Sequence, residues 1–264
     1  MRISLIQMPV KSGAVRENLA CAAHHLDEAI RRRSEFILLP EMWSTGFAYR
    51  EFPGLAQEAL PETLRLLQST ARKAGAWVSG TLPEVEGKKV YNTMFWLDPT
   101  GRIAGRYQKV HLFPPMGEDE RLAPGRRLLT VETPFGRLGG CICFDIRFPE
   151  LARRLAIEGA KLLAVPAQFP HPRRDHWLTL LKARAIENQC FVAAANIVGR
   201  DGRLEFFGAS RLIDPWGEEI AGGEEEEGVI TAEIDLSRAD QVRSQLPAFA
   251  VRRPDVYGDL AAPE

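Results

Sequence analysis

The sequence of 264 residues is short of cysteine, of long apolar runs and of any charge excess, and each shortage excludes a class of protein. Its four cysteines are spaced neither as a zinc site nor as the disulfide framework of a small secreted domain. Residues 1–9 are typical of a short strand rather than of a signal peptide. We therefore expect a reduced, cytoplasmic protein.

Charge and hydropathy argue against two kinds of partner. Lysine and arginine number 34, aspartate and glutamate 35, and the net charge is −1. A chain without a basic excess is not expected to bind nucleic acid or a membrane surface. No window approaches the roughly 18 apolar residues that cross a bilayer. We predict neither nucleic acid nor a membrane as a partner.

Several motifs of known chemistry are also missing. The sequence has no His-Glu-x-x-His helix, no Gly-x-Ser-x-Gly elbow and no phosphate-binding glycine loop. We therefore expect an activity that uses no metal and no cofactor. Of the five histidines, only His111 and His176 lie near loops of interest. A cysteine–histidine pair of the papain type remains an alternative on this evidence.

What the sequence does have is an apolar content of 45% and an alternation of short apolar strands with helices. This pattern predicts one α/β domain with a mixed sheet system and a C-terminal extension. The acidic run 224–227 is predicted to be a solvated turn. The expected strands are residues 3–8, 36–40, 76–81, 90–97, 102–107, 128–131, 138–144, 161–165, 190–197, 206–213 and 228–234, and the expected helices are residues 17–33, 58–74, 151–157 and 175–189.

The chain is organised around residues 139–150, where a buried strand gives way to a helix. Pro149 suits the first helical position, and Glu150 suits the first turn, where the helix dipole stabilises negative charge. Cys143 therefore lies where the strand ends and the chain bends toward a helix N-terminus. Because such a place lowers the pKa of a thiol, we predict that Cys143 is a nucleophile.

The alternative role for Cys143 is that of a small buried hydrophobic residue, as is usual for cysteine. Cys141 lies two residues earlier, so we expect it on the same side of the strand and in the core. Its position at the end of the strand distinguishes Cys143 from Cys141.

Two charged residues also follow buried strands. Glu41 comes after residues 36–40, where loss of water raises the pKa of a carboxyl group and makes it a usable general base. Lys109 comes after residues 102–107, and a lysine there is suited to stabilising an oxyanion. Taken singly, Glu41 is better explained as a cap of the following turn and Lys109 as a surface residue. Ligands of α/β sheets gather at such strand ends, however.

Together the three stretches resemble the nitrilase superfamily of carbon–nitrogen hydrolases, which uses a Glu–Lys–Cys triad in this chain order. The matching motifs are Leu39-Pro-Glu41-Met-Trp, Tyr107-Gln-Lys109-Val-His-Leu-Phe and Cys141-Ile-Cys143-Phe-Asp-Ile-Arg-Phe-Pro-Glu150. Three motifs in order with these flanks are highly specific. The resemblance implies that Glu41, Lys109 and Cys143 are catalytic.

The resemblance also implies an architecture. The family fold is a four-layer α-β-β-α sandwich of the α/β class, in which two sheets face each other between pairs of helices. We expect residues 1–236 to form this domain and residues 237–264 to form an extension at the interface of a homodimer. A second catalytic glutamate of the family matches Glu118, and Glu120 lies close enough to leave that assignment open.

The chain most resembles the ω-amidase subgroup, which hydrolyses the terminal amide of 2-oxoglutaramate or 2-oxosuccinamate to the acid and ammonia. The implied mechanism is attack by Cys143 on the amide, through a thioester intermediate. The alternatives are an N-carbamoyl-amino-acid amidase, a deaminated-glutathione amidase, a nitrilase, or a family member without activity.

An ω-amide carries a carboxylate far from the bond to be cleaved, and this carboxylate needs a cationic partner. Arg173, in a loop rich in hydrogen-bond donors, is suited to a bidentate pair with it. Arg147 is a second candidate, and a salt bridge that orients the elbow is its alternative role. The other residues predicted to bind substrate are Phe47, Phe144, Gln168 and Phe169.

Overall fold

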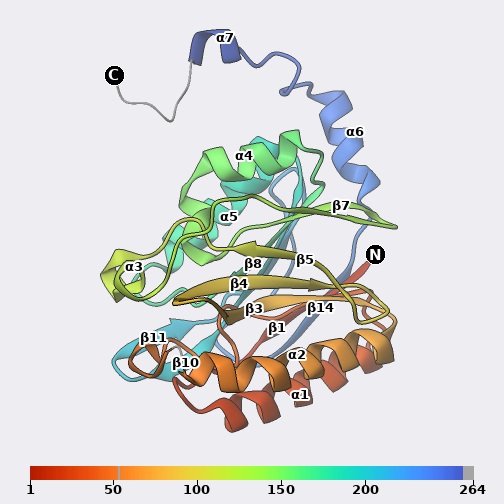
Figure 1. Cartoon of the computed structure of the whole chain (residues 1–264). Helices are drawn as coiled ribbons and strands as arrows, with labels where there is room; N and C mark the ends of the chain where they lie inside the picture. The colour runs from red at the N-terminus through yellow and green to blue at the C-terminus, as the bar shows by residue number, and fades with distance from the viewer. Residues whose placement is uncertain (53, 258–264) are drawn as a thin grey trace.

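The computed structural model describes residues 1–52 and 54–257, and Figure 1 shows their arrangement. The strands are β1 (Arg2–Gln7), β2 (Phe36–Leu38), β3 (Trp77–Glu86), β4 (Lys89–Leu97), β5 (Ile103–Gln108), β6 (Thr130–Thr133), β7 (Gly136–Gly140), β8 (Leu162–Ala167), β9 (Phe191–Asn196), β10 (Val198–Asp201), β11 (Leu204–Phe207), β12 (Arg211–Ile213), β13 (Glu219–Gly222) and β14 (Gly228–Glu233). The α-helices are α1 (Val15–Arg31), α2 (Gly54–Ala74), α3 (Glu118–Arg121), α4 (Pro149–Ile157), α5 (Arg174–Asn188), α6 (Ser237–Gln245) and α7 (Pro254–Tyr257). The 3₁₀ turns are η1 (Tyr49–Glu51), η2 (Pro114–Met116) and η3 (Cys143–Arg147).

Two six-stranded sheets organise the chain. The first has the order β14-β1-β2-β3-β4-β5, and the second has the order β13-β12-β9-β8-β7-β6. In each sheet three neighbouring strands run parallel, β1 to β3 in the first and β7 to β9 in the second. The pairings beyond them are antiparallel. A separate hairpin of β10 and β11 lies outside both sheets.

The two sheets face each other between two helical layers (Figure 1). Helices α1 and α2 cover the outer face of the first sheet, and helices α4 and α5 cover the outer face of the second. The fold is therefore the four-layer α-β-β-α sandwich that the resemblance implies.

Strand β2 shows how the sequence leads to burial on both faces. Phe36 and Leu38 belong to the core between the sheets, whereas Ile37 and Leu39 belong to the core beneath α1 and α2. Alternate residues of a strand point to opposite faces, so a continuous apolar run is what a doubly covered strand requires. This run ends directly before Glu41, which is thereby fixed at the edge of a rigid sheet.

The strand before Cys143 is shorter than predicted. Strand β7 ends at Gly140, so Cys141 and Cys143 do not share a strand face, and Cys143 begins the turn η3. The backbone N–H of Ile142 donates to the side chain of Asp145 at 2.8 Å rather than to a neighbouring strand. Cys141 is buried in the core, as predicted.

The prediction of one strand over residues 206–213 is wrong. Gly208 and Ala209 have left-handed φ values of 62° and 53°, and they separate β11 from β12. The side chain of Asn196 donates to the carbonyl of Gly208 at 2.8 Å, which holds the break in place. The partner strands β10 and β13 were not predicted at all.

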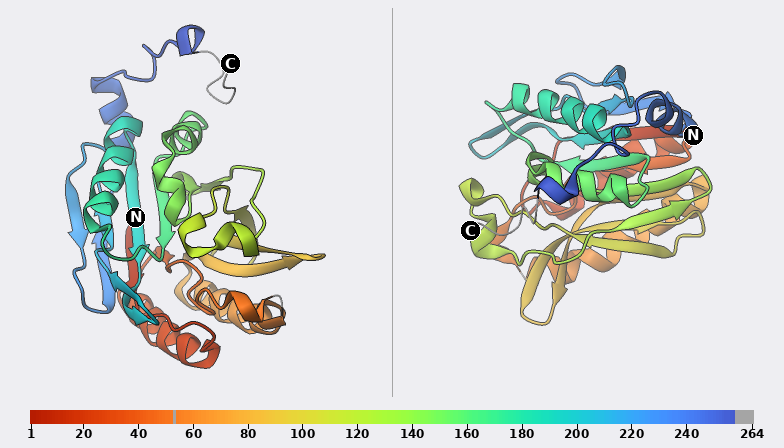
Figure 2. Two further views of the ribbon diagram at one scale, coloured as in Figure 1. Left: turned by 90° about the vertical axis from the view of Figure 1, so that its left-hand side faces the viewer. Right: turned by 90° about the horizontal axis from the view of Figure 1, so that it is seen from above.

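The C-terminal segment leaves the body of the molecule after β14. Ala239 and Val242 anchor α6, whereas α7 carries only exposed residues and lies apart from the sandwich (Figures 1 and 2). The last part of the predicted extension, residues 258–264, lies outside the described residues. Within the described part of the chain, no helix combines the length and the apolar character needed to cross a bilayer.

Candidate active site

Three residues that are distant in the chain lie close together in the structure. Glu41 follows β2, Lys109 follows β5 and Cys143 follows β7. Met42 and Cys143 have left-handed φ values of 44° and 47°, which residues with side chains rarely adopt. Such strain persists only where the surrounding structure holds it, and it is typical of functional sites.

Lys109 joins two carboxylates at the centre of this group. Its Nζ donates to Glu41 Oε1 at 2.8 Å and to Glu118 Oε2 at 2.7 Å. The exposed fractions of the three side chains are at most 1%. Glu118, rather than the exposed Glu120, belongs to the cluster.

Other donors fix both carboxylates. The Asn92 side chain donates to Glu41 Oε1 at 2.8 Å, and the backbone N–H of Gln168 donates to Glu41 Oε2 at 2.9 Å. The backbone N–H of Phe113 donates to Glu118 Oε2 at 2.8 Å. Asn92 was not predicted, since one polar residue within strand β4 gives no recognisable signal in the sequence.

Asp145 is a second residue that the sequence reasoning missed. Its carboxylate is fully buried and accepts hydrogen bonds from Ile142 N–H (2.8 Å), the Tyr107 hydroxyl (2.7 Å) and His111 N–H (3.0 Å). It therefore ties the segment that carries Lys109 to the turn that carries Cys143. The only feature of the sequence that could have indicated a role for Asp145 is its position two residues after Cys143.

The protonation states differ from those predicted. Burial and the neighbouring Glu41 raise the pKa of the Cys143 thiol well above its usual range. The prediction of a lowered thiol pKa is therefore wrong, because desolvation and a carboxylate outweigh the backbone dipoles. Burial opposes the charge of Lys109, but Glu41 and Glu118 together raise its pKa well above the ordinary value. Near neutral pH the site holds a neutral thiol beside a charged lysine.

These groups line one cavity. Every residue predicted for catalysis or for substrate binding contributes to its wall, as do four that were not predicted. The predicted residues are Glu41, Phe47, Lys109, Glu118, Cys143, Phe144, Arg147, Gln168, Phe169 and Arg173, and the others are Tyr49, Phe113, Met116 and Pro170.

Two arginines form a cationic side of this cavity. The guanidinium of Arg147 lies 5.7 Å from the ring centre of Phe169, and that of Arg173 lies 5.2 Å from the ring centre of Phe113. Both arginines line the same cavity, and burial together with the charge of Arg173 lowers the pKa of Arg147. Within residues 1–52 and 54–257 neither arginine forms an ion pair, and the alternative role of Arg147 as a salt-bridge residue is therefore not observed.

The histidines do not form a papain-type pair with Cys143. His111 Nδ1 lies 2.8 Å from Asp145 Oδ1, and His176 Nδ1 lies 3.2 Å from a guanidinium nitrogen of Arg147. Neither histidine lines the cavity, whereas Glu41 does, and its carboxylate is one of the groups that raise the pKa of the Cys143 thiol.

The model of the carbon–nitrogen hydrolase family matches residues 2–244. The chain belongs to the carbon–nitrogen hydrolase family. This carbon–nitrogen hydrolase is 40% identical to the 2-oxoglutaramate amidase of Bacillus subtilis, over 97% of its own length and 98% of the relative's. It is 36% identical to an omega-amidase of Xenopus tropicalis, over 97% and 96% of the two chains.

The carbon–nitrogen hydrolase is also similar to a solved structure of an amidase mutant from Nesterenkonia sp. AN1. The two share 26% identity and superimpose with a TM-score of 0.87, over 97% of this chain and 95% of the other. In that structure the active-site cysteine carries the acetamide moiety of fluoroacetamide.

Proposed function

We propose that the protein hydrolyses the terminal amide of a small 2-oxo dicarboxylic acid monoamide, such as 2-oxoglutaramate or 2-oxosuccinamate, to the acid and ammonia. The observation that carries this proposal is the convergence of Glu41, Lys109 and Cys143 in one cavity with a cationic side. Relatives at 36–40% identity that are named 2-oxoglutaramate amidase and omega-amidase support it.

The first half of the reaction acylates the cysteine. Glu41 takes the proton of the Cys143 thiol as the sulfur attacks the amide carbonyl. Lys109 and the backbone N–H of Phe144 stabilise the oxyanion that forms. The carbon–nitrogen bond then breaks, Glu41 gives its proton to the leaving nitrogen, and ammonia departs from a thioester on Cys143.

The second half hydrolyses the thioester. Glu41 takes a proton from a water molecule, which attacks the thioester carbonyl, and the same two donors stabilise the second oxyanion. The carbon–sulfur bond breaks, the acid leaves, and the proton held by Glu41 returns to Cys143. The raised pKa of the Cys143 thiol supports this scheme, because a neutral thiol needs an adjacent base.

Glu118 keeps Lys109 in position in this scheme. Both of its oxygens accept hydrogen bonds from Lys109 Nζ, at 2.9 and 2.7 Å. Glu118 thereby holds the ammonium beside the cavity and stabilises its charge in a buried place.

Arg147 and Arg173 receive the substrate carboxylate. Among residues 1–52 and 54–257 neither guanidinium has an acidic partner, so the two groups repel each other, and a carboxylate between them relieves that repulsion. Phe144 and Phe169 hold Arg147 against the wall, at 5.9 and 5.7 Å from its guanidinium. The apolar wall then packs against the carbon chain of the substrate.

A panel of substrates tests the proposal. Ammonia release is measured from 2-oxoglutaramate, 2-oxosuccinamate, an N-carbamoyl amino acid, deaminated glutathione and a simple nitrile. The proposal expects the largest kcat/KM for the two ω-amides. A larger kcat/KM for a carbamoyl acid, deaminated glutathione or the nitrile would overturn the substrate assignment. No turnover of any of the five substrates would contradict enzymatic function.

We infer further that residues 1–236 form the catalytic domain of a cytoplasmic homodimer, with the C-terminal extension at its interface. Large apolar side chains that are exposed on α4, α5 and the C-terminal segment support this pairing. They are Ile157, Ile186, Leu246, Val251, Val256 and Tyr257. Light scattering is expected to give twice the 29.5 kDa of one chain, and a mass of one chain would contradict the dimer.

A further inference from the structure

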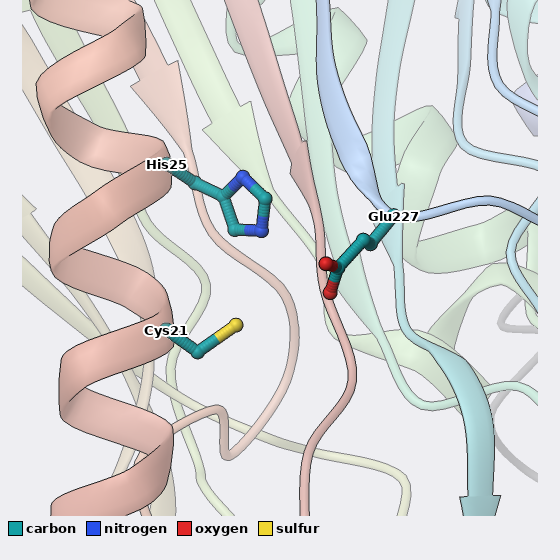
Figure 3. Close-up of side chains that lie close together, drawn as sticks. All are labelled: Cys21, His25 and Glu227. Atoms are coloured by element: carbon teal, nitrogen blue, oxygen red, sulfur yellow. The ribbon is translucent and has the colours of Figure 1, made fainter.

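A second group of side chains with ligand chemistry lies outside the catalytic cavity. Figure 3 shows Cys21 and His25 on one face of α1, directed toward Glu227 in the turn before β14. Cys21 and His25 are four residues apart, so one helical turn places them side by side. The thiol sulfur, an imidazole nitrogen and a carboxylate oxygen all lie within 4.8 Å of one another.

These three side chains have no other polar partner in the part of the chain that the structure describes. His25 is only 4% exposed, and its Nδ1 is buried without a hydrogen bond. Cys21 is a free thiol. By contrast, the nearby acids Glu28 and Glu224 are engaged by arginines. The other ring nitrogen, Nε2, lies on the side of Cys21 and Glu227 (Figure 3), where a ligand can reach it.

We infer that Cys21, His25 and Glu227 bind one divalent transition-metal ion of the zinc type, with water at a fourth position. A thiolate, an imidazole and a carboxylate are the ligands that zinc prefers. Ligand atoms around a tetrahedral zinc ion stand about 3.3–3.8 Å apart. Glu227 is exposed, so its side chain can rotate to close the remaining separation.

A metal ion binds the neutral form of imidazole and the thiolate form of cysteine. The ion therefore replaces the proton of the Cys21 thiol, and one proton is released for each ion bound.

The bound ion joins α1 to the turn before β14, the edge strand of the first sheet. It therefore stabilises the folded chain without touching the catalytic cavity. Two glutamates of the acidic run 224–227 then have different roles. Glu224 pairs with Arg174 and Arg211, whereas Glu227 is a metal ligand.

A neighbouring group provides matched controls. His24, His25 and Glu28 also lie within ligand distance of one another, but Glu28 is paired with Arg32 and His24 is exposed. Substitutions of His24 and Glu28 therefore change a histidine and an acid on the same helix without changing the proposed ligand set.

The test is a titration of the full chain with Co²⁺, followed by competition with Zn²⁺. The chain carries Cys143→Ser so that the catalytic thiol cannot contribute. We expect one equivalent of Co²⁺ to bind with a sulfur-to-cobalt charge-transfer band, and Zn²⁺ to displace it. Cys21→Ser removes the band, and His25→Gln or Glu227→Gln weakens binding at least about tenfold. His24→Ala and Glu28→Gln leave binding unchanged.

Three results would overturn the site. They are the lack of stoichiometric binding, a charge-transfer band that survives Cys21→Ser, and a Kd that depends on His24 or Glu28 rather than on Glu227. Because Glu227 lies on the surface, Glu227→Gln reports on the ligand even if His25→Gln disturbs packing beneath α1.

Discussion

At the scale of single residues, Glu41 has two tasks. Its oxygens accept hydrogen bonds from Lys109, Asn92 and the backbone of Gln168, and it also faces the thiol of Cys143. These donors orient the carboxylate. A thiol with a raised pKa needs a base beside it, which is the role proposed for Glu41.

Glu41→Gln tests this assignment. The substitution keeps the size of the side chain but removes the base, so we expect kcat/KM to fall about 10²–10⁴-fold. Ammonia release measures the loss, and thermal unfolding shows whether the chain still folds. Glu120→Gln removes an exposed carboxylate two residues from Glu118 and serves as the control. Activity of Glu41→Gln near that of Glu120→Gln would count against Glu41 as the base.

The two arginines of the cavity lead to a prediction about specificity. Arg173→Gln removes one charge-assisted contact to the substrate carboxylate, worth about 1.5–3 kcal/mol, or about 10–100-fold in kcat/KM. The loss is expected for 2-oxoglutaramate and not for a neutral aliphatic amide. Arg174→Gln is the matched control, because the neighbouring Arg174 pairs with Glu224 outside the cavity. An equal loss on both substrates would show that Arg173 has a structural role instead.

The meeting of Glu41, Lys109 and Cys143 in one cavity could be predicted, because each residue follows an apolar strand and their motifs are specific. The pKa of Cys143 was predicted with the wrong sign. Its surroundings include Glu41, and nothing near Cys143 in the chain reveals that contact. Asn92 could not be predicted for the same reason, since its partner Glu41 comes from another strand.

At the scale of elements, Asp145 holds the turn η3. Asp145→Asn leaves fewer acceptors for Ile142 N–H, the Tyr107 hydroxyl and His111 N–H, so we expect a loss of about 1.5–3 kcal/mol in the free energy of unfolding. Since the turn also positions Cys143, kcat should fall as well. Urea unfolding and ammonia release measure the two effects. An Asp145→Asn chain with the free energy of unfolding and the kcat of the unsubstituted chain would contradict this role of Asp145.

The positions of most strands and helices followed from apolar periodicity, whereas their ends did not. Strand β7 ends early because the side chain of Asp145 captures a backbone N–H, and the break between β11 and β12 depends on Asn196. Both are contacts between a side chain and the backbone, which periodicity does not report. The layering of the two sheets came from the family resemblance alone.

At the scale of the whole molecule, the cysteines link stability to pH. Burial raises the pKa of Cys21 to about 11 and that of Cys190 to about 12, and it raises the pKa values of Cys141 and Cys143 well above the usual range. In the unfolded chain a thiol titrates near pH 8.5, so from about pH 8.5 to about pH 10 the unfolded chain loses protons that the folded chain keeps. Stability should therefore fall as pH rises through this range, by up to about 1.4 kcal/mol per pH unit for each thiol.

Thermal unfolding of the metal-free chain over this pH range checks the prediction. Cys21→Ser removes one of the titrating thiols at a half-buried position, and it should make the decline of Tm with pH shallower. A Tm that stays constant or rises with pH in the unsubstituted chain would contradict the assignment of buried, protonated thiols.

The central claim is that one thiol, activated by a carboxylate from another strand, performs the reaction. Ammonia release by Cys143→Ala, with Cys21→Ala as the control for loss of a thiol outside the cavity, tests it most directly. We predict that Cys143→Ala loses at least about 10⁴-fold in kcat while its circular dichroism and Tm stay near those of the unsubstituted chain. Turnover retained by a folded Cys143→Ala chain would contradict the account.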